Sequence, residues 1–233
     1  MIVGEWVELL RGLGADLGAG LEMKLVAGTP AESLPAVHLE LLHSLNGLSV
    51  YNGAFRLLGV GRREPALDLI TWNAGETWRF AWDDRIDPYL IFGETAWGDQ
   101  YAYRKGASGA VDREVYFLEG TLLRPEVLAG SFEEFMVSEF LRNARDPYDG
   151  LTIEVVQRRG PIDPGKHWMY APSIALGGIE SIDNVIEMPA VTAMTFAGDV
   201  ASALRASRPG TSPAEVTPWT DDLGRSRLKV AFV

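Results

Sequence analysis

The stretch that decides the fold is YLIFGETAWGDQYAYRKGASGAVDREVYFL, residues 89–118. It contains three strand-like segments, residues 89–93, 100–104 and 114–118, which are rich in β-branched or aromatic side chains. Glycine, aspartate and serine separate the segments, and tyrosines occupy alternate positions of the middle one. Strands so closely spaced along the chain predict an antiparallel meander.

The turn between the first two segments is predicted at Gly98 and Asp99. Glycine accepts a positive φ there, and an aspartate side chain caps such turns. Upstream, residues 55–60 (FRLLGV) also suit a strand, and residues 65–72 suit a short helix. The sequence therefore predicts a mainly antiparallel sheet that begins before the meander.

Two amphipathic segments are predicted to flank this sheet as helices. In residues 34–45 the apolar side chains recur at helical spacing, and Asn46 and Gly47 are expected to supply a left-handed C-cap. The second helix begins at residues 131–134 (SFEE), which form a capping box, and ends at the Asp-Pro pair at 146–147. A further short helix is expected over residues 5–10, before a glycine-rich stretch at 12–20.

The composition changes near residue 148, which predicts a domain at 1–147 and a smaller extension at 148–233. Residues 151–159 are ambiguous between helix and strand. Residues 189–206 suit a helix with Gly198 as its weak point, and residues 215–219 and 227–232 are expected to pair as a hairpin. The fold class expected is α+β: a mainly antiparallel sheet flanked by helices, plus a smaller C-terminal α+β extension.

The net charge of the chain is −11, from 32 acidic and 21 basic residues among 233. Such a field repels nucleic-acid phosphates and anionic membranes, so neither is an expected partner. It attracts a basic protein and accelerates the encounter with it. The alternative is that the acidity serves only solubility.

No cysteine is present, which excludes disulfides, thiol nucleophiles and zinc-thiolate sites. The first six residues (MIVGEW) are not typical of a secretion signal, and no apolar run approaches the ~20 residues that span a bilayer. These features predict a soluble protein of a reducing compartment, most simply the cytoplasm.

The search for catalytic motifs finds none. His38 and His43 are five residues apart, so they do not share a helix face as a zinc pair would, and surface or boundary positions are expected for both. His167 follows Gly165 and Lys166 with no carboxylate motif beside it, and a role as general base stays open. Nucleophile-elbow and phosphate-loop motifs are also absent. We therefore expect no enzyme, no catalytic residue, no metal site and no cofactor.

Acidic and aromatic residues concentrate in the middle of the chain, where four of the seven tryptophans lie within residues 72–97. Most of these tryptophans are expected in the core. The acidic cluster is typical of a solvated turn, which is the favoured interpretation. The alternative is a partner-binding surface, and the candidate residues are Asp83, Asp84, Asp87, Trp97 and Asp99.

Three segments together resemble the SUKH superfamily, named for fungal cell-wall assembly regulators and their bacterial relatives. They are the LP-helix-NG segment at 34–47, the strand–GD turn–aromatic strand at 91–103, and SFEEFM at 131–136. The resemblance implies a helix-flanked antiparallel sheet and, for bacterial members, immunity proteins that neutralise toxins, often nucleases or deaminases.

The C-terminal part resembles certain type VI secretion immunity proteins, through GPIDPG at 160–165 and YAPSIALGG at 170–178. The resulting hypothesis is an immunity protein that binds a basic protein toxin. A non-enzymatic scaffold of the cell-wall regulator type is the first alternative. A hydrolase that uses a carboxylate pair or His167 is the second.

Overall fold

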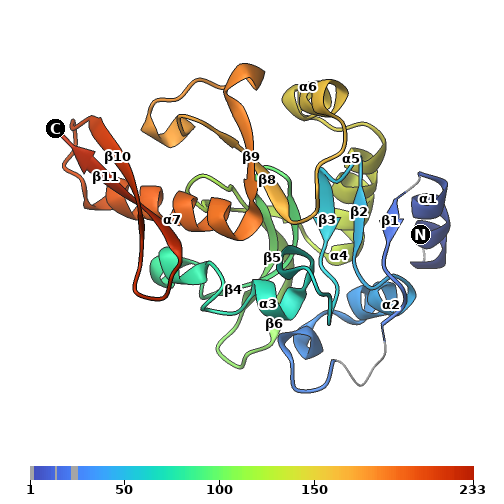
Figure 1. Cartoon of the computed structure of the whole chain (residues 1–233). Helices are drawn as coiled ribbons and strands as arrows, with labels where there is room; N and C mark the ends of the chain where they lie inside the picture. The colour runs from blue at the N-terminus through green and yellow to red at the C-terminus, as the bar shows by residue number, and fades with distance from the viewer. Residues whose placement is uncertain (1–2, 14, 22–25) are drawn as a thin grey trace.

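The computed structural model describes residues 3–13, 15–21 and 26–233, and its architecture is α+β. A seven-stranded antiparallel sheet runs in chain order from β1 to β7, so each strand pairs with the next one in the sequence. Figure 1 shows this sheet between the N-terminal helices and the C-terminal elements. The strands are β1 Asp16–Leu17, β2 Leu48–Val50, β3 Phe55–Leu57, β4 Tyr89–Thr95, β5 Gln100–Lys105, β6 Val111–Leu118 and β7 Pro125–Ala129.

The predicted meander is confirmed as β4, β5 and β6. Ile91 pairs with Ala102, and Tyr103 pairs in turn with Val115. Gly98 has a φ of 84°, as the predicted turn requires. The sequence did not predict β2, whose three residues are too few to show alternation, or β7, whose residues are mostly exposed.

Helices flank the sheet, and α1 is the first element of the described chain. The α-helices are α1 Val3–Gly12, α2 Ala36–Ser44, α3 Leu69–Trp72, α4 Phe132–Phe135, α5 Leu141–Arg145, α6 Gly150–Arg159 and α7 Ala190–Ala206. Short 3-10 turns are η2 Pro30–Ser33, η3 Pro65–Leu67, η4 Arg79–Ala81, η5 Asp83–Arg85, η7 Ile174–Leu176 and η8 Ile182–Asn184, and η6 Met136–Phe140 is a π-helical segment between α4 and α5. No helix among the described residues is long and apolar enough to cross a bilayer.

The capping box forms only in part. The Ser131 side chain accepts from the Glu134 amide, but the Glu134 carboxylate accepts from the amide of Gly130 and not from that of Ser131. The C-terminal cap of α2 also differs from the predicted one, in which Asn46 and Gly47 were both cap residues. Gly47 has a positive φ, whereas Asn46 uses its side chain to donate to the Val60 carbonyl and to accept from the Val60 amide.

The expectation of a surface or boundary position is wrong for His38, which is completely buried. Its ring stacks on Phe132 with 4.1 Å between centroids, and its Nδ1 lies 3.1 Å from the Tyr103 hydroxyl. The spacing to His43 excluded a metal pair but could not show that the sheet covers one of the two rings. Most tryptophans lie in the core, as expected: Trp6, Trp72, Trp78, Trp82 and Trp168 are buried.

The residues after 148 form α6, a β8–β9 hairpin, α7 and a terminal hairpin. The strands are β8 Lys166–Tyr170, β9 Val185–Pro189, β10 Pro213–Thr220 and β11 Ser226–Phe232. The terminal hairpin was predicted, the ambiguous segment at 151–159 is helical, and β8 and β9 were missed. Figure 1 shows the terminal hairpin at the opposite end of the molecule from α1.

These C-terminal elements contact the first sheet through buried polar groups. The Arg56 guanidinium on β3 donates to the carbonyls of Pro164 and Lys166, and the Trp82 indole donates to the carbonyl of Met194. The amide of Trp168 donates to the carbonyl of Ala96 at the end of β4. The division at residue 148 stays a prediction, but the two predicted parts pack against each other.

Gly198 lies where α7 crosses η4, so its role is packing. A Cβ built there would lie 2.8 Å from both the Cβ and the carbonyl oxygen of Ala81. We expect Gly198→Ala to lower the free energy of unfolding by about 1–3 kcal/mol in urea titrations, although alanine is the better helix former. Gly150→Ala is the matched control, because Gly150 is exposed in a helix with nothing within 4 Å of that position. Equal stability of Gly198→Ala and wild type would contradict the close approach.

Candidate functional site

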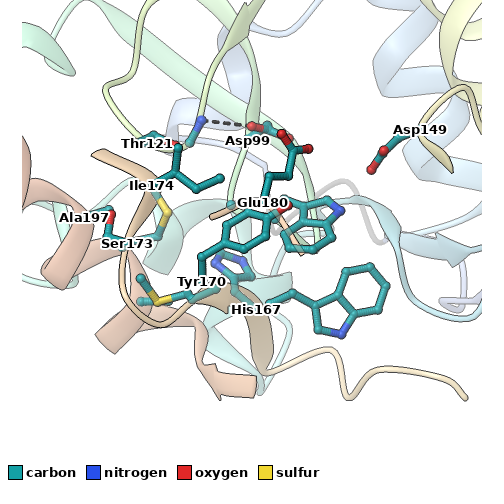
Figure 2. Close-up of a pocket in the computed structure, with 16 residues that line it drawn as sticks. Asp99, Thr121, Asp149, His167, Tyr170, Ser173, Ile174, Glu180 and Ala197 are labelled. Atoms are coloured by element: carbon teal, nitrogen blue, oxygen red, sulfur yellow. Dashed lines mark hydrogen bonds between the residues drawn. The ribbon is translucent and has the colours of Figure 1, made fainter. Parts of the chain in front are cut away.

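A pocket of about 320 Å³ lies where the β4–β5 turn meets the C-terminal elements. Residues 97–99 of the turn form one wall, and β8 with the loop after it forms another. The N-terminus of α6, one face of α7 and residues 120–121 between β6 and β7 also line it. Figure 2 shows the lining side chains converging from these separate segments.

Three carboxylates line the pocket, from Asp99, Asp149 and Glu180. In Figure 2 these groups lie on one side of the Tyr170 and His167 rings. Among the described residues that line the pocket, none is lysine or arginine. A cavity of this charge favours a cationic guest, since low-dielectric walls concentrate the field of the carboxylates.

Asp99 is held in place by the turn that it caps. One carboxylate oxygen accepts from the Gly120 amide at 2.9 Å, and the other accepts from the Thr95 hydroxyl at 2.7 Å. Burial raises the pKa of Asp99 above its ordinary value, and the two hydrogen bonds oppose that rise only in part. A cation that enters the pocket would therefore compensate a carboxylate that is costly to ionise.

Asp149 and Glu180 come from elements that the sequence did not connect. Asp149 is the N-cap of α6, and its carboxylate accepts from the amides of Leu151 and Thr152. Glu180 is exposed in the loop that follows β8. Both carboxylates lie close enough to the Tyr170 hydroxyl to raise its pKa further, after burial as the largest cause.

An aromatic wall stands beside the carboxylates. Trp97 stacks on Tyr170 with ring centroids 5.1 Å apart and planes 14° apart, and it packs against Trp168 at 5.3 Å. The Trp97 indole donates to the Thr152 hydroxyl at 2.8 Å, which fixes its orientation. These rings offer flat π faces next to negative charge, the arrangement that attracts organic cations.

The lining residue His167 connects the pocket to a buried polar chain. His167 is 1% exposed, and its Nε2 lies 3.0 Å from Glu94, which also receives a 2.9 Å bond from Arg56. Burial alone would raise the pKa of Glu94, but His167 and Arg56 outweigh it and lower that pKa, so Glu94 is ionised and accepts from both. The Nδ1 of His167 has no hydrogen-bond partner among the described residues.

The predicted partner-binding residues fall into two groups. Trp97 and Asp99 line the pocket, whereas Asp83, Asp84 and Asp87 are exposed on and after η5 and are not among the residues that line it. Asp83 instead pairs with Arg205 of α7. A binding role for these three aspartates stays a prediction.

Sequence reasoning missed Asp149, Glu180 and Tyr170 as site residues, and it left His167 without a partner. The partner of His167, Glu94, lies 73 positions away in sequence. Only Asp149 carried a local signal, as an N-cap residue before an apolar segment. No group of three or more His, Cys, Asp or Glu residues within the described ranges is arranged to hold a metal ion.

Comparison with known proteins shows a likeness in fold. No family model matches the chain, and no curated protein matches it. The crystal structure of Atu4351 from Agrobacterium tumefaciens is similar, with a TM-score of 0.54 and 12% sequence identity. The match covers 94% of this chain and 95% of that chain. At this identity the likeness concerns the fold alone, and it extends over both predicted parts of the chain.

Proposed function

We propose that this protein is an immunity protein that acts in the cytoplasm, where it binds a basic protein toxin and neutralises it. The observation that carries the proposal is the pocket with three carboxylates beside the Trp97–Tyr170 stack. Aromatic side chains next to complementary charge are typical of the residues that dominate protein interfaces. The net charge of −11 supports the same partner chemistry.

The toxin is of the nuclease or deaminase type, which the resemblance to bacterial SUKH proteins implies. Enzymes that act on nucleic acid carry basic surfaces, because they must approach phosphates. An acidic binder competes for that surface and blocks the approach of the substrate. Inhibition then needs shape and charge complementarity but no chemical reaction.

The test is co-expression with the toxin genes encoded beside the gene of this protein. We expect full protection of the host from one such toxin, a purified complex of the two proteins, and an association rate that falls at least about tenfold between low and high salt. Stopped-flow tryptophan fluorescence measures this rate. Failure to bind or suppress any adjacent toxin would remove the proposal.

The hydrolase alternative is based on the buried His167–Glu94 pair. His167 lines the pocket, and its Nδ1 has no hydrogen-bond partner among the described residues. Assays of the purified protein with chromogenic ester, phosphodiester and glycoside substrates distinguish the two functions. Turnover that His167→Gln abolishes would favour the hydrolase over the binding protein. We expect no turnover by either the wild type or this variant.

A further inference from the structure

The buried ring of His167 is the least expected feature of the pocket, because one of its nitrogens has no partner within the described part of the chain. With Nε2 donating to Glu94, the neutral ring presents Nδ1 as an acceptor. A buried acceptor without a donor lacks the hydrogen bond that water would give it, and a ligand that supplies the donor restores that bond. The pocket is thus incomplete at one defined atom.

A glycine packs closely beside this nitrogen. A Cβ at Gly98, which also lines the pocket, would lie 3.3 Å from Nδ1 of His167 and 3.2 Å from the sulfur of Met194. The glycine is already required by its φ of 84°. A side chain at this position would therefore crowd the imidazole.

The remaining groups define the guest. Three carboxylates demand positive charge, the Trp97–Tyr170 stack offers flat faces, and Nδ1 of His167 demands a hydrogen-bond donor. A guanidinium satisfies all three demands, because it is planar, permanently charged and carries five N–H donors. An ammonium is a compact, strongly hydrated charge that does not stack.

We infer that this pocket is a receptor for an arginine side chain presented by the protein partner. The inference rests on the proposed function for the identity of that partner, but the pocket itself can be tested without it. Asp149 and Glu180 neutralise the guanidinium, and the Trp97–Tyr170 wall stacks on it. His167 accepts one of its N–H groups.

The experiment titrates the full-length protein with Nα-acetyl-arginine amide and follows the indole signal of Trp97 and the ring nitrogens of His167 by NMR. We expect saturable binding with a Kd of about 1 mM, as suits a single side chain without the rest of an interface. The Nδ1 resonance of His167 should shift on binding. The acetylated amides of citrulline and lysine should bind at least about tenfold more weakly, since one lacks the charge and the other the planar fork.

The double variant Asp149→Asn with Glu180→Gln removes two lining charges and keeps the helix cap, because asparagine also caps well. We expect it to weaken arginine binding at least about fivefold, in the range of a lost charge-assisted contact. The control is Glu76→Gln with Asp112→Asn, which makes the same change in net charge at exposed positions outside the pocket. If both double variants weaken arginine binding equally, the effect comes from the net charge of the whole protein, and the receptor is overturned.

The same two variants separate this inference from the proposed function. If the wild type shows no saturable binding of the arginine compound and the pocket variant still binds the toxin, the arginine receptor is overturned and the immunity function stands. If the arginine compound binds at His167 but the protein binds no toxin encoded beside its gene, the receptor stands and the proposed immunity function is overturned. Lysine binding as tight as arginine binding overturns the guanidinium specificity.

Discussion

Arg56→Met should lower the free energy of unfolding by about 3–5 kcal/mol, the usual cost of breaking a buried ion pair from one side. Arg56 and Glu94 are both completely buried, and their ion pair measures 2.9 Å. Without the guanidinium, the Glu94 carboxylate keeps its charge in the core, and its remaining side-chain partners among the described residues are the His167 ring and the Gln100 amide. Urea titration followed by tryptophan fluorescence measures the loss.

The guanidinium also holds backbone carbonyls at the junction between the sheet and the C-terminal elements. It donates to the carbonyl of Gly53 beside β3 and to those of Asp163, Pro164 and Lys166 at the start of β8 and in the loop before it. Losing it therefore loosens the contact between the main sheet and the C-terminal elements. Hydrogen exchange should show faster opening of β8 in the variant than in the wild type.

Two further variants make this prediction specific. Arg113→Met makes the same substitution at an exposed position of β6 and should stay within about 0.5 kcal/mol of wild type. The double variant Arg56→Met with Glu94→Gln should be more stable than Arg56→Met alone, because it also removes the buried charge. A single variant within about 1 kcal/mol of wild type would contradict a central role for the pair.

His38→Phe should remove much of the loss of stability that acid causes. Burial lowers the pKa of His38 from 6.5 to about 3 in the folded protein. Between these two pH values the unfolded chain binds a proton that the folded protein refuses. The contribution of His38 to stability is therefore fully present above pH 6.5 and is lost as the pH falls below it, by about 1.4 kcal/mol per pH unit.

The measurement is the free energy of unfolding as a function of pH, for the wild type and the variant. Phenylalanine keeps the ring contacts with Phe132 and Phe92 but deprives Tyr103 of its partner, which costs about 1 kcal/mol at every pH. The difference between wild type and variant should thus be constant above pH 6.5 and change below it, in favour of the variant. A difference that does not change with pH would contradict a neutral buried His38.

His43→Phe is the matched control, because His43 is on the same helix and exposed. Water reaches its ring in the folded and the unfolded chain alike. Its substitution therefore controls for the exchange of an imidazole for a phenyl ring on this helix. The contrast between two histidines five residues apart then reports burial alone.

Several elements could be predicted because their signals are local. The meander follows from alternation and turn residues within one short stretch of chain, and such signals require no distant partner. The terminal hairpin likewise follows from two strands around a short turn. The missed strands β8 and β9 lie apart in sequence and mix polar and apolar residues without a clear period.

The candidate site was predictable only where it coincides with a turn of the meander. Trp97 and Asp99 were found because they lie in that turn, whereas His167, Tyr170 and Glu180 reach it from β8 and its following loop. The acidic turn at Asp83 was a candidate because of its charge and aromatic density, and neither reports which charges share a cavity.

The sequence by itself determined the α+β class, the meander, most of the tryptophan core and the acidic character, because each depends on composition or on residues close together in the chain. Only the tertiary structure decided that His38 is buried, that Arg56, Glu94 and His167 form one chain of contacts, and that three carboxylates surround one pocket. The physical reason is that such contacts form when the folded backbone brings distant segments together. Periodicity along the sequence reports local structure and not which distant residues come into contact.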